Sequence, residues 1–261
     1  MNRTLQRLLA TAATGIVLAG TLGAGTALAA RATVPRVSDP AAARAGVGRC
    51  EPLRITARAE PTVANLQAVG RCEIDRRLET LTKLQSVVDA STALTDAHEA
   101  ALDNILSSTS AGLRALRTEI EGDTTVDALR EDIRRIFEDF RVYALVGRQV
   151  WLVKATDTVV VTAARFATTA ERLEAAIARA EANKKDVADA RKHLAAMIAS
   201  VDKAKAEVEG VASPVLSLIP AAWNAGDAAP VLRAARESVR DARVALREAM
   251  KAARAVLADL R

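Results

Sequence analysis

The stretch that decides the fold is VVVTAARFATTAERLEAAIARA, residues Val159–Ala180. Apolar side chains recur along it at alternating intervals of four and three residues, at Val159, Ala163, Phe166, Ala170, Leu173, Ile177 and Ala180. This heptad spacing predicts one long helix with a narrow apolar seam that other helices must cover. Five of the six aromatic residues of the chain lie between Ile136 and Ala180. We therefore expect the rest of the chain to pack around this segment.

The same heptad continues beyond this stretch at Val187, Leu194, Val201 and Val208. One interpretation is therefore a single helix that runs through to residue 208. However, Asn183 suits the left-handed position that ends a helix, and Asp186 suits an N-cap. We expect a hairpin turn at Asn183–Asp186, within a long helical hairpin over residues 149–210.

Residues 230–261 carry the most regular heptad of the chain, at Leu232, Ala235, Val239, Ala242, Leu246, Ala249, Ala253, Val256 and Leu260. A pattern sustained over four heptads is typical of a coiled coil, and alanine on one side of the seam allows helix axes to approach closely. Pro230 suits the first position of this helix. Residues 211–229 contain Pro214, Pro220 and Gly226, and we expect a loop there that crosses back over the bundle.

Three shorter helices are expected over residues 62–146. The first runs from about Thr62 to Leu94, and the second begins at Asp96, where Glu99 completes a capping box. The third ends near Tyr143. Gly147 marks either a break before the next helix or a point within one continuous helix, since glycine costs a helix interior only about 1 kcal/mol. We expect the break.

The composition agrees with helices rather than sheets. Aromatic residues make up only 2% of the 261 residues, and the apolar residues are mostly Ala, Val and Leu. Such a chain cannot form a thick globular core, but it can form helices that pack on alanine faces. The predicted fold is all-α: an elongated antiparallel bundle of about six helices over residues 62–261, without a sheet.

Residues 1–29 have the layout of a secretory signal peptide. Arg3 and Arg7 precede the apolar stretch Leu8–Leu28, and Ala27–Ala29 fits a small-x-small cleavage site. Its removal would leave a chain that starts at Ala30 and would lower the net charge from +5 to +3. An uncleaved membrane anchor is the alternative. Residues 30–61 are rich in Pro, Ala and Arg without an apolar period, and we expect a flexible extended segment.

The chain has two cysteines, Cys50 and Cys72. Export permits a disulfide, and a Cys50–Cys72 bridge would fix the N-terminal segment to the first helix. Two free buried thiols are the alternative. Neither cysteine belongs to a C-x-x-C motif, which argues against redox catalysis.

Several short motifs resemble a group of uncharacterised secreted all-helical proteins of actinobacteria. They are RCEIDRRL at Arg71–Leu78, LTD at Leu94–Asp96, GLRAL at Gly112–Leu116, DT at Asp123–Thr124, FRVY at Phe140–Tyr143 and LIPAAWN at Leu218–Asn224. Many members of the group have a proline near Arg148 and a glycine near Lys184, where this chain has neither. The resemblance implies an exported helical protein and carries over no catalytic residue.

No pattern of catalytic or metal-binding residues is visible. His98 and His193 fall on different predicted helices, without the close spacing of zinc ligands, so each is interpreted as a single surface histidine. Neither a G-x-S-x-G elbow nor a glycine-rich phosphate loop occurs. We therefore expect no enzyme activity, no cofactor and no metal.

The last helix carries a line of cations beside its apolar seam, at Arg233, Arg236, Arg240, Arg243, Arg247, Lys251 and Arg254. We call these seven residues the basic ridge. One interpretation is contact with an anionic polymer or lipid surface outside the membrane. The other is ion pairing with acids of a neighbouring helix, such as Glu131, Asp132, Glu138 and Asp139. We expect no nucleic-acid partner, because the predicted export removes the chain from the cytoplasm and the sequence has no platform of alternating aromatic and basic residues.

Two functions follow as hypotheses. The first is a secreted, non-enzymatic structural or interaction protein that is associated with the cell envelope and whose partner is an anionic envelope polymer or another helical protein. The second is an extracytoplasmic bundle that binds a small molecule in a pocket near Tyr143, Trp151 and Phe166. The alternative for these aromatic residues is that they fill space where helices diverge. Similarly, Trp223 either holds the long loop to the bundle or contacts a partner. The sequence leaves the oligomeric state open.

Overall fold

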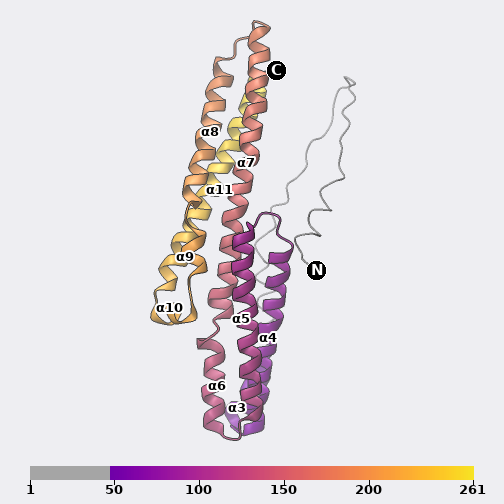
Figure 1. Ribbon diagram of the computed structural model, residues 1–261, viewed down its shortest axis with the longest axis vertical. Helices are drawn as coiled ribbons and strands as arrows, with labels where there is room; N and C mark the ends of the chain where they lie inside the picture. Colours follow the sequence, from indigo (N-terminus) through magenta and orange to yellow (C-terminus); the bar gives the residue numbers. More distant parts are fainter. Residues whose placement is uncertain (1–47) are drawn as a thin grey trace, which may run out of the picture. The chain divides into compact units, whose positions relative to one another are not determined.

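The computed structural model describes residues 48–261 (Figure 1). The predicted leader, residues 1–29, and the segment from residue 30 to 47 lie outside the described residues. Within residues 48–261 the regular secondary structure is entirely helical. Six of these helices have 13 residues or more, and their long contacts are antiparallel, which confirms the predicted all-α bundle. No helix in this range is both long enough and apolar enough to cross a membrane.

The first half of the described chain contains α3 (Glu51–Ala59), α4 (Val63–Asp89), α5 (Asp96–Gly122) and α6 (Val126–Glu138). A threonine hydroxyl caps each of the last three, because Thr62, Thr95 and Thr125 accept hydrogen bonds from the backbone amides of Asn65, His98 and Ala128. The N-cap of α5 is therefore Thr95, one residue before the predicted Asp96.

Helix α3 corrects the interpretation of residues 30–61 as extended throughout. Pro52 lies in its first turn, where a missing amide hydrogen has no cost, and Pro61 follows its end. One residue of α3, Ala57, is buried, and Cys50 directly before it is disulfide-bonded to Cys72. The short helix is thus held against α4 by a covalent bond, a constraint that apolar periodicity alone does not reveal.

The break between the third and fourth long helices is not at Gly147, so that prediction was wrong. Gly147 is the first residue of α7 (Gly147–Ala182), and the π-helical turn η1 (Val142–Val146) leads directly into it. The chain breaks at residues 139–141 instead, where Arg141 has a left-handed backbone with φ 42°. The Arg141 Nε donates a hydrogen bond of 2.7 Å to Oδ1 of Asn224, which contributes to holding this break in place.

The predicted hairpin after α7 is confirmed, and the continuous helix is excluded. Helix α7 ends at Ala182, and α8 spans Ala188–Val208. The left-handed residue of the turn is Lys184, with φ 59°, not Asn183. The N-cap of α8 is Val187, one residue after the predicted Asp186, although Asp186 Oδ1 accepts a hydrogen bond of 3.0 Å from the amide of Ala188, the first residue of α8.

The return segment is more ordered than a simple loop. It contains α9 (Ala212–Leu216) and α10 (Pro220–Ala225), and α11 spans Ala228–Asp259. Pro230 therefore occupies the third position of α11, not the first. Trp223 is partly buried against the apolar side chains that α3 to α6 bury together, with the Arg148 guanidinium 5.2 Å from its ring centroid. It thus packs the return segment onto the bundle.

Two main groups of buried side chains hold these helices together. One joins α3 to α6 with η1, the start of α7, α9 and the start of α11. The other joins the later part of α7 with α8 and α11, and includes Phe166, Met197 and Ala249. Helix α11 contacts both α8 and α7, and Figure 1 shows α7 continuing past α5 alongside α8.

Candidate functional site

The basic ridge lies on the exposed side of α11. All seven of its residues are exposed, whereas Leu232, Ala235, Val239 and Ala242 on the opposite side are buried. Exposed apolar side chains flank it, at Val244, Met250 and Leu257. The surface of α11 therefore combines a line of positive charge with scattered apolar contact area.

The ridge is not neutralised by acids of α6, in contrast to the second interpretation. Within residues 48–261, Arg233, Arg236, Arg243, Arg247 and Arg254 make no ion pair. The other two ridge cations pair only within α11: Arg240 Nε lies 2.9 Å from Oδ1 of Asp241, and Lys251 Nζ lies 4.0 Å from Oε2 of Glu248.

The acids of α6 instead bind arginines of their own helix. Arg134 contacts Glu131 and Glu138, and Arg135 contacts Asp132 and Asp139. These carboxylates are therefore already partnered on α6.

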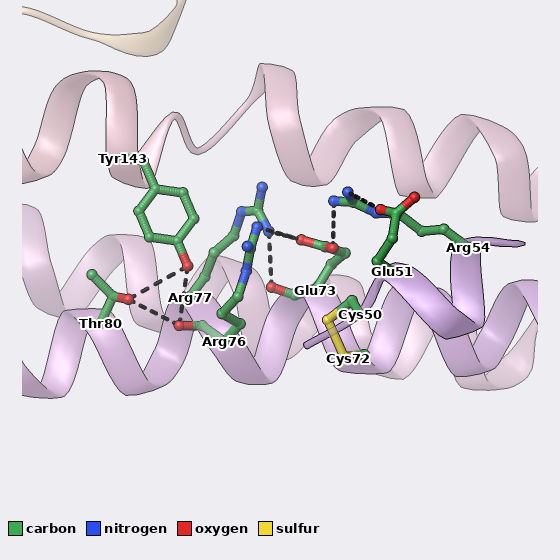
Figure 2. Close-up of polar contacts among 9 residues, drawn as sticks. All are labelled: Cys50, Glu51, Arg54, Cys72, Glu73, Arg76, Arg77, Thr80 and Tyr143. Carbon is green, nitrogen blue, oxygen red and sulfur yellow. Dashed lines mark hydrogen bonds and ion pairs between the residues drawn. A yellow bond between two sulfur atoms is a disulfide. The ribbon is translucent and has the colours of Figure 1, made fainter. Parts of the chain in front are cut away.

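A second group of charges is buried near the disulfide (Figure 2). The Glu73 carboxylate has no exposed area, and three guanidiniums converge on it: Arg54 at 2.5 Å, Arg76 at 2.9 Å and Arg77 at 2.6 Å. Burial by itself would raise the pKa of Glu73, but the hydrogen bond from Arg77 and the nearby positive charges outweigh it and lower that pKa. Burial lowers the pKa of Arg77, yet a guanidinium keeps its charge in proteins.

Tyr143, which is half-exposed, and the disulfide lie beside these buried charges. The guanidiniums of Arg76 and Arg77 lie 5.0 and 5.3 Å from the centroid of the Tyr143 ring, and Tyr143 Oη donates a hydrogen bond of 3.3 Å to the carbonyl of Arg76. The predicted Cys50–Cys72 bond is present, which excludes two free thiols. It fixes the start of α3, from which Arg54 reaches Glu73 (Figure 2). The cluster therefore joins α3, α4 and η1.

The structure does not form the predicted pocket near Tyr143, Trp151 and Phe166. Tyr143 and Trp151 are 45% and 44% exposed, and Trp151 contacts the ammonium of Lys154. Phe166 is buried elsewhere, between α7, α8 and α11. Because Phe166 lies about five turns of α7 from η1 and about four turns from Trp151, these three aromatic side chains do not line a shared cavity.

His98 and Asp157 form a pair that the sequence analysis missed. His98 Nδ1 lies 2.9 Å from both carboxylate oxygens of Asp157, and Oδ2 of Asp157 also accepts a hydrogen bond of 3.0 Å from the amide of Thr95. Asp157 is only 3% exposed. The signal was present in the sequence, because Thr156 and Asp157 interrupt the buried stripe of α7 with polar side chains.

His193 forms a more exposed pair on the other part of the bundle. Its Nδ1 lies 2.8 Å from Oδ2 of Asp259. Both histidines are partly exposed, and the interpretation of each as a single surface residue was incomplete, because each pairs with an aspartate. Within residues 48–261, no group of three or more His, Cys, Asp or Glu side chains could hold a metal ion.

Comparison of the chain with models of protein families, with curated proteins and with solved structures finds no significant match. The resemblance to secreted actinobacterial proteins therefore stays a prediction, and any function has to be inferred from the surfaces and sites described above.

Proposed function

We propose that this chain is an exported, non-enzymatic helical-bundle protein of the cell envelope whose basic ridge binds an anionic polymer outside the membrane. The observation behind this function is the exposed charge of α11. All seven ridge cations are exposed, and five of them have no ion pair within residues 48–261. Their charge is therefore available to a partner.

The spacing of the ridge favours an extended partner. From Arg233 to Arg254 the cations follow one side of α11 over about 30 Å, at ~1.5 Å per residue. A linear polyanion can contact several of them in turn, whereas a small anion would contact one or two. The flanking Met250 and Leu257 can also contact apolar parts of such a polymer.

Export is supported by two features. Residues 1–29 have the pattern of a signal peptide, and the Cys50–Cys72 disulfide is typical of proteins from oxidising compartments. An anionic polymer of the envelope is the class of partner that an exported cationic surface would meet.

Cosedimentation with isolated cell envelopes tests this function. The chain from Ala30 to Arg261 is compared with a variant in which Arg236, Arg240, Arg243 and Arg247 are changed to Gln. A matched control removes the same charge from exposed positions of four other helices, through Arg114→Gln, Arg130→Gln, Arg172→Gln and Lys192→Gln. Protease-treated envelopes separate a polymer from a protein partner.

We expect the unchanged chain and the control to bind at low salt and to be released as salt rises, because exposed charges are screened over about 10 Å at 0.1 M salt. The ridge variant should lose this binding. Equal binding by the ridge variant and the control would show that total charge, not the ridge, is responsible. Loss of binding after protease treatment would point to a protein partner instead.

A further inference from the structure

A pocket of about 330 Å³ lies beside the His98–Asp157 pair. Three parts of the chain line it: the connection between α4 and α5, the middle of α7, and the connection from α8 to α9. Its volume is at the lower end of the range for small-molecule sites, about 300–1,000 Å³. Most of its surface is apolar, with contributions from Val160, Val161 and Val208.

Two polar atoms at this pocket lack a partner. The hydroxyl oxygen of Thr156 is buried without a hydrogen bond, and the residue is only 4% exposed. Buried hydroxyls are normally satisfied, so this one is a candidate for contact with a ligand. The second atom is Nε2 of His98, which makes no hydrogen bond within residues 48–261.

The Asp157 carboxylate determines which role the free histidine nitrogen has. Because both carboxylate oxygens are acceptors, Nδ1 of His98 carries the proton that it donates to Asp157. In the neutral ring Nε2 is then an acceptor. Asp157 is itself held by the amide of Thr95, so the ring has a fixed orientation.

The lining residues also define the charge of a ligand. They include the carboxylates of Asp157 and Glu209 and the hydroxyls of Thr156 and Ser213, and no Lys or Arg is among them. Such a site offers hydrogen-bond acceptors and negative charge. The arrangement is complementary to a group that only donates hydrogen bonds and is positively charged.

We propose that this pocket binds a small organic ammonium with an aliphatic body. The ammonium donates to His98 Nε2 and Thr156 Oγ1 and is attracted by Glu209, and the aliphatic part contacts the valines of α7 and α8. A histidine oriented by a carboxylate is also common at metal sites, but no cluster of three or more ligand side chains occurs within residues 48–261. This inference does not depend on the proposed role of the basic ridge.

The test is NMR titration of the full exported chain with n-hexylamine, observed through the ring nitrogens of the two histidines. His193 is an internal control, because it pairs with Asp259 in the same way but does not line this pocket. Three variants accompany it. Thr156→Val removes the unpartnered hydroxyl at nearly constant shape, Glu209→Gln removes one charge at the pocket, and Asp202→Asn removes one exposed charge of α8 elsewhere.

We expect hexylamine to shift the His98 Nε2 resonance and to leave His193 unchanged. Thr156→Val should weaken binding about fivefold, as expected for one lost hydrogen bond. Glu209→Gln should weaken it roughly threefold, and Asp202→Asn should not change it. Thr156→Val is expected to fold normally, because it removes a buried polar atom that has no partner.

Several results would overturn the proposal. The first is that millimolar hexylamine does not shift the His98 resonance. The second is that the Thr156→Val variant binds hexylamine with the same affinity as the unchanged chain. The third is that zinc chloride shifts the His98 resonance more than hexylamine does. Hexanoate is the charge-reversed probe. A second pocket, lined by Arg54, Arg58 and Arg130, can attract it, so only hexanoate binding that is weakened by Thr156→Val counts against an ammonium site.

Discussion

The Glu73 carboxylate lies 2.6 Å from the guanidinium of Arg77, one turn further along α4, and these two side chains are 0% and 4% exposed. Two charges buried this deeply have lost most of their hydration, so each depends on the other. Arg77 Nη1 also donates a hydrogen bond of 2.9 Å to the carbonyl of Glu73. The pair is therefore the centre of the junction between α3, α4 and η1.

Replacement of Glu73 by Gln should destabilise the protein by about 3–5 kcal/mol, because it leaves the buried Arg77 without a counter-ion. The pKa of Glu73 is lowered below its ordinary value of 4.5. Its contribution to stability is therefore complete above pH 4.5 and is lost as the pH falls through the lowered pKa. Urea unfolding between pH 7 and pH 3 measures both effects.

The control for this experiment is Glu79→Gln, which removes the exposed partner of Arg49. It should leave the unfolding midpoint at pH 7 nearly unchanged, because solvent screens an exposed pair. Glu73→Gln should also show less loss of stability between pH 4.5 and pH 3 than the unchanged chain. If Glu73→Gln and the unchanged chain lose stability equally between pH 4.5 and pH 3, the assigned role of Glu73 is contradicted.

Removal of the disulfide by Cys50→Ser and Cys72→Ser should destabilise the protein by about 3 kcal/mol. The bond closes a loop with a sequence separation of 22, and a crosslink of that size restricts the unfolded chain by about this amount. In the folded state α3 should open first, since it is short and contributes one buried residue. Hydrogen exchange should show lost protection in Glu51–Ala59 and unchanged protection in α8.

The glycines of α5 provide a packing test. A Cβ at Gly112 would lie 2.6 Å from Cε1 of Phe140, whereas a Cβ at Gly122 would meet nothing within 4 Å. Glycine-to-alanine changes normally stabilise a helix by up to about 1 kcal/mol. We expect that gain for Gly122→Ala, and a loss of about 1–3 kcal/mol for Gly112→Ala because the ring must move. Thermal unfolding of both variants measures these changes in stability. If Gly112→Ala stabilises the protein, Phe140 is loosely packed.

The parts of the fold that were predictable depend on local periodicity. The heptads of α7, α8 and α11 identified their buried faces, and the turn at residues 183–186 was predicted from the preferences of Asn183 and Asp186 for helix ends, although the left-handed residue and the N-cap each lie one residue later. The break at Arg141 was not found, because the left-handed residue is an arginine and the nearby glycine, Gly147, is an ordinary helical residue. Its position depends partly on the contact with Asn224, which lies 83 residues further along the chain.

The candidate sites also differ in how far the sequence alone predicts them. The basic ridge follows from the spacing of seven cations on one helix, so the sequence alone defines it. Whether those cations are paired depends on which helices are neighbours. The His98–Asp157 pair joins residues 59 apart, and no local pattern connects them. A polar pair at Thr156 and Asp157 within a buried stripe was the only warning in the sequence.

Lys184 offers a test of the turn between α7 and α8. Lys184 has a left-handed backbone, which lowers the stability of the folded state by about 1–2 kcal/mol for any residue with a side chain, and glycine avoids this cost. However, glycine gives the unfolded chain more conformational freedom, which lowers the free energy of unfolding by about 0.4–1 kcal/mol. Lys184→Gly should therefore stabilise the protein slightly, by up to about 1 kcal/mol. Lys185→Gly is the control and should destabilise it, because Lys185 Nζ contacts the carbonyls of Leu260 and Arg261.

The alanine seam of α11 provides the last prediction. Ala249 has no exposed area and lies in the core that α11 shares with α7 and α8, whereas Ala234 is exposed on the same helix. Leucine at position 249 would need space that only a larger distance between the helices can supply. Ala249→Leu should destabilise the protein by about 1–3 kcal/mol, and Ala234→Leu should change its stability by no more than about 0.5 kcal/mol.

Urea unfolding monitored by circular dichroism compares the two variants, which add the same number of methyl and methylene groups to the same helix. Light scattering after gel filtration checks that neither variant changes its oligomeric state, since an exposed leucine can promote association. If Ala249→Leu is as stable as the unchanged chain, the helices have room at this position. Close approach on alanine would then not be the reason why α11 carries small residues on its buried face.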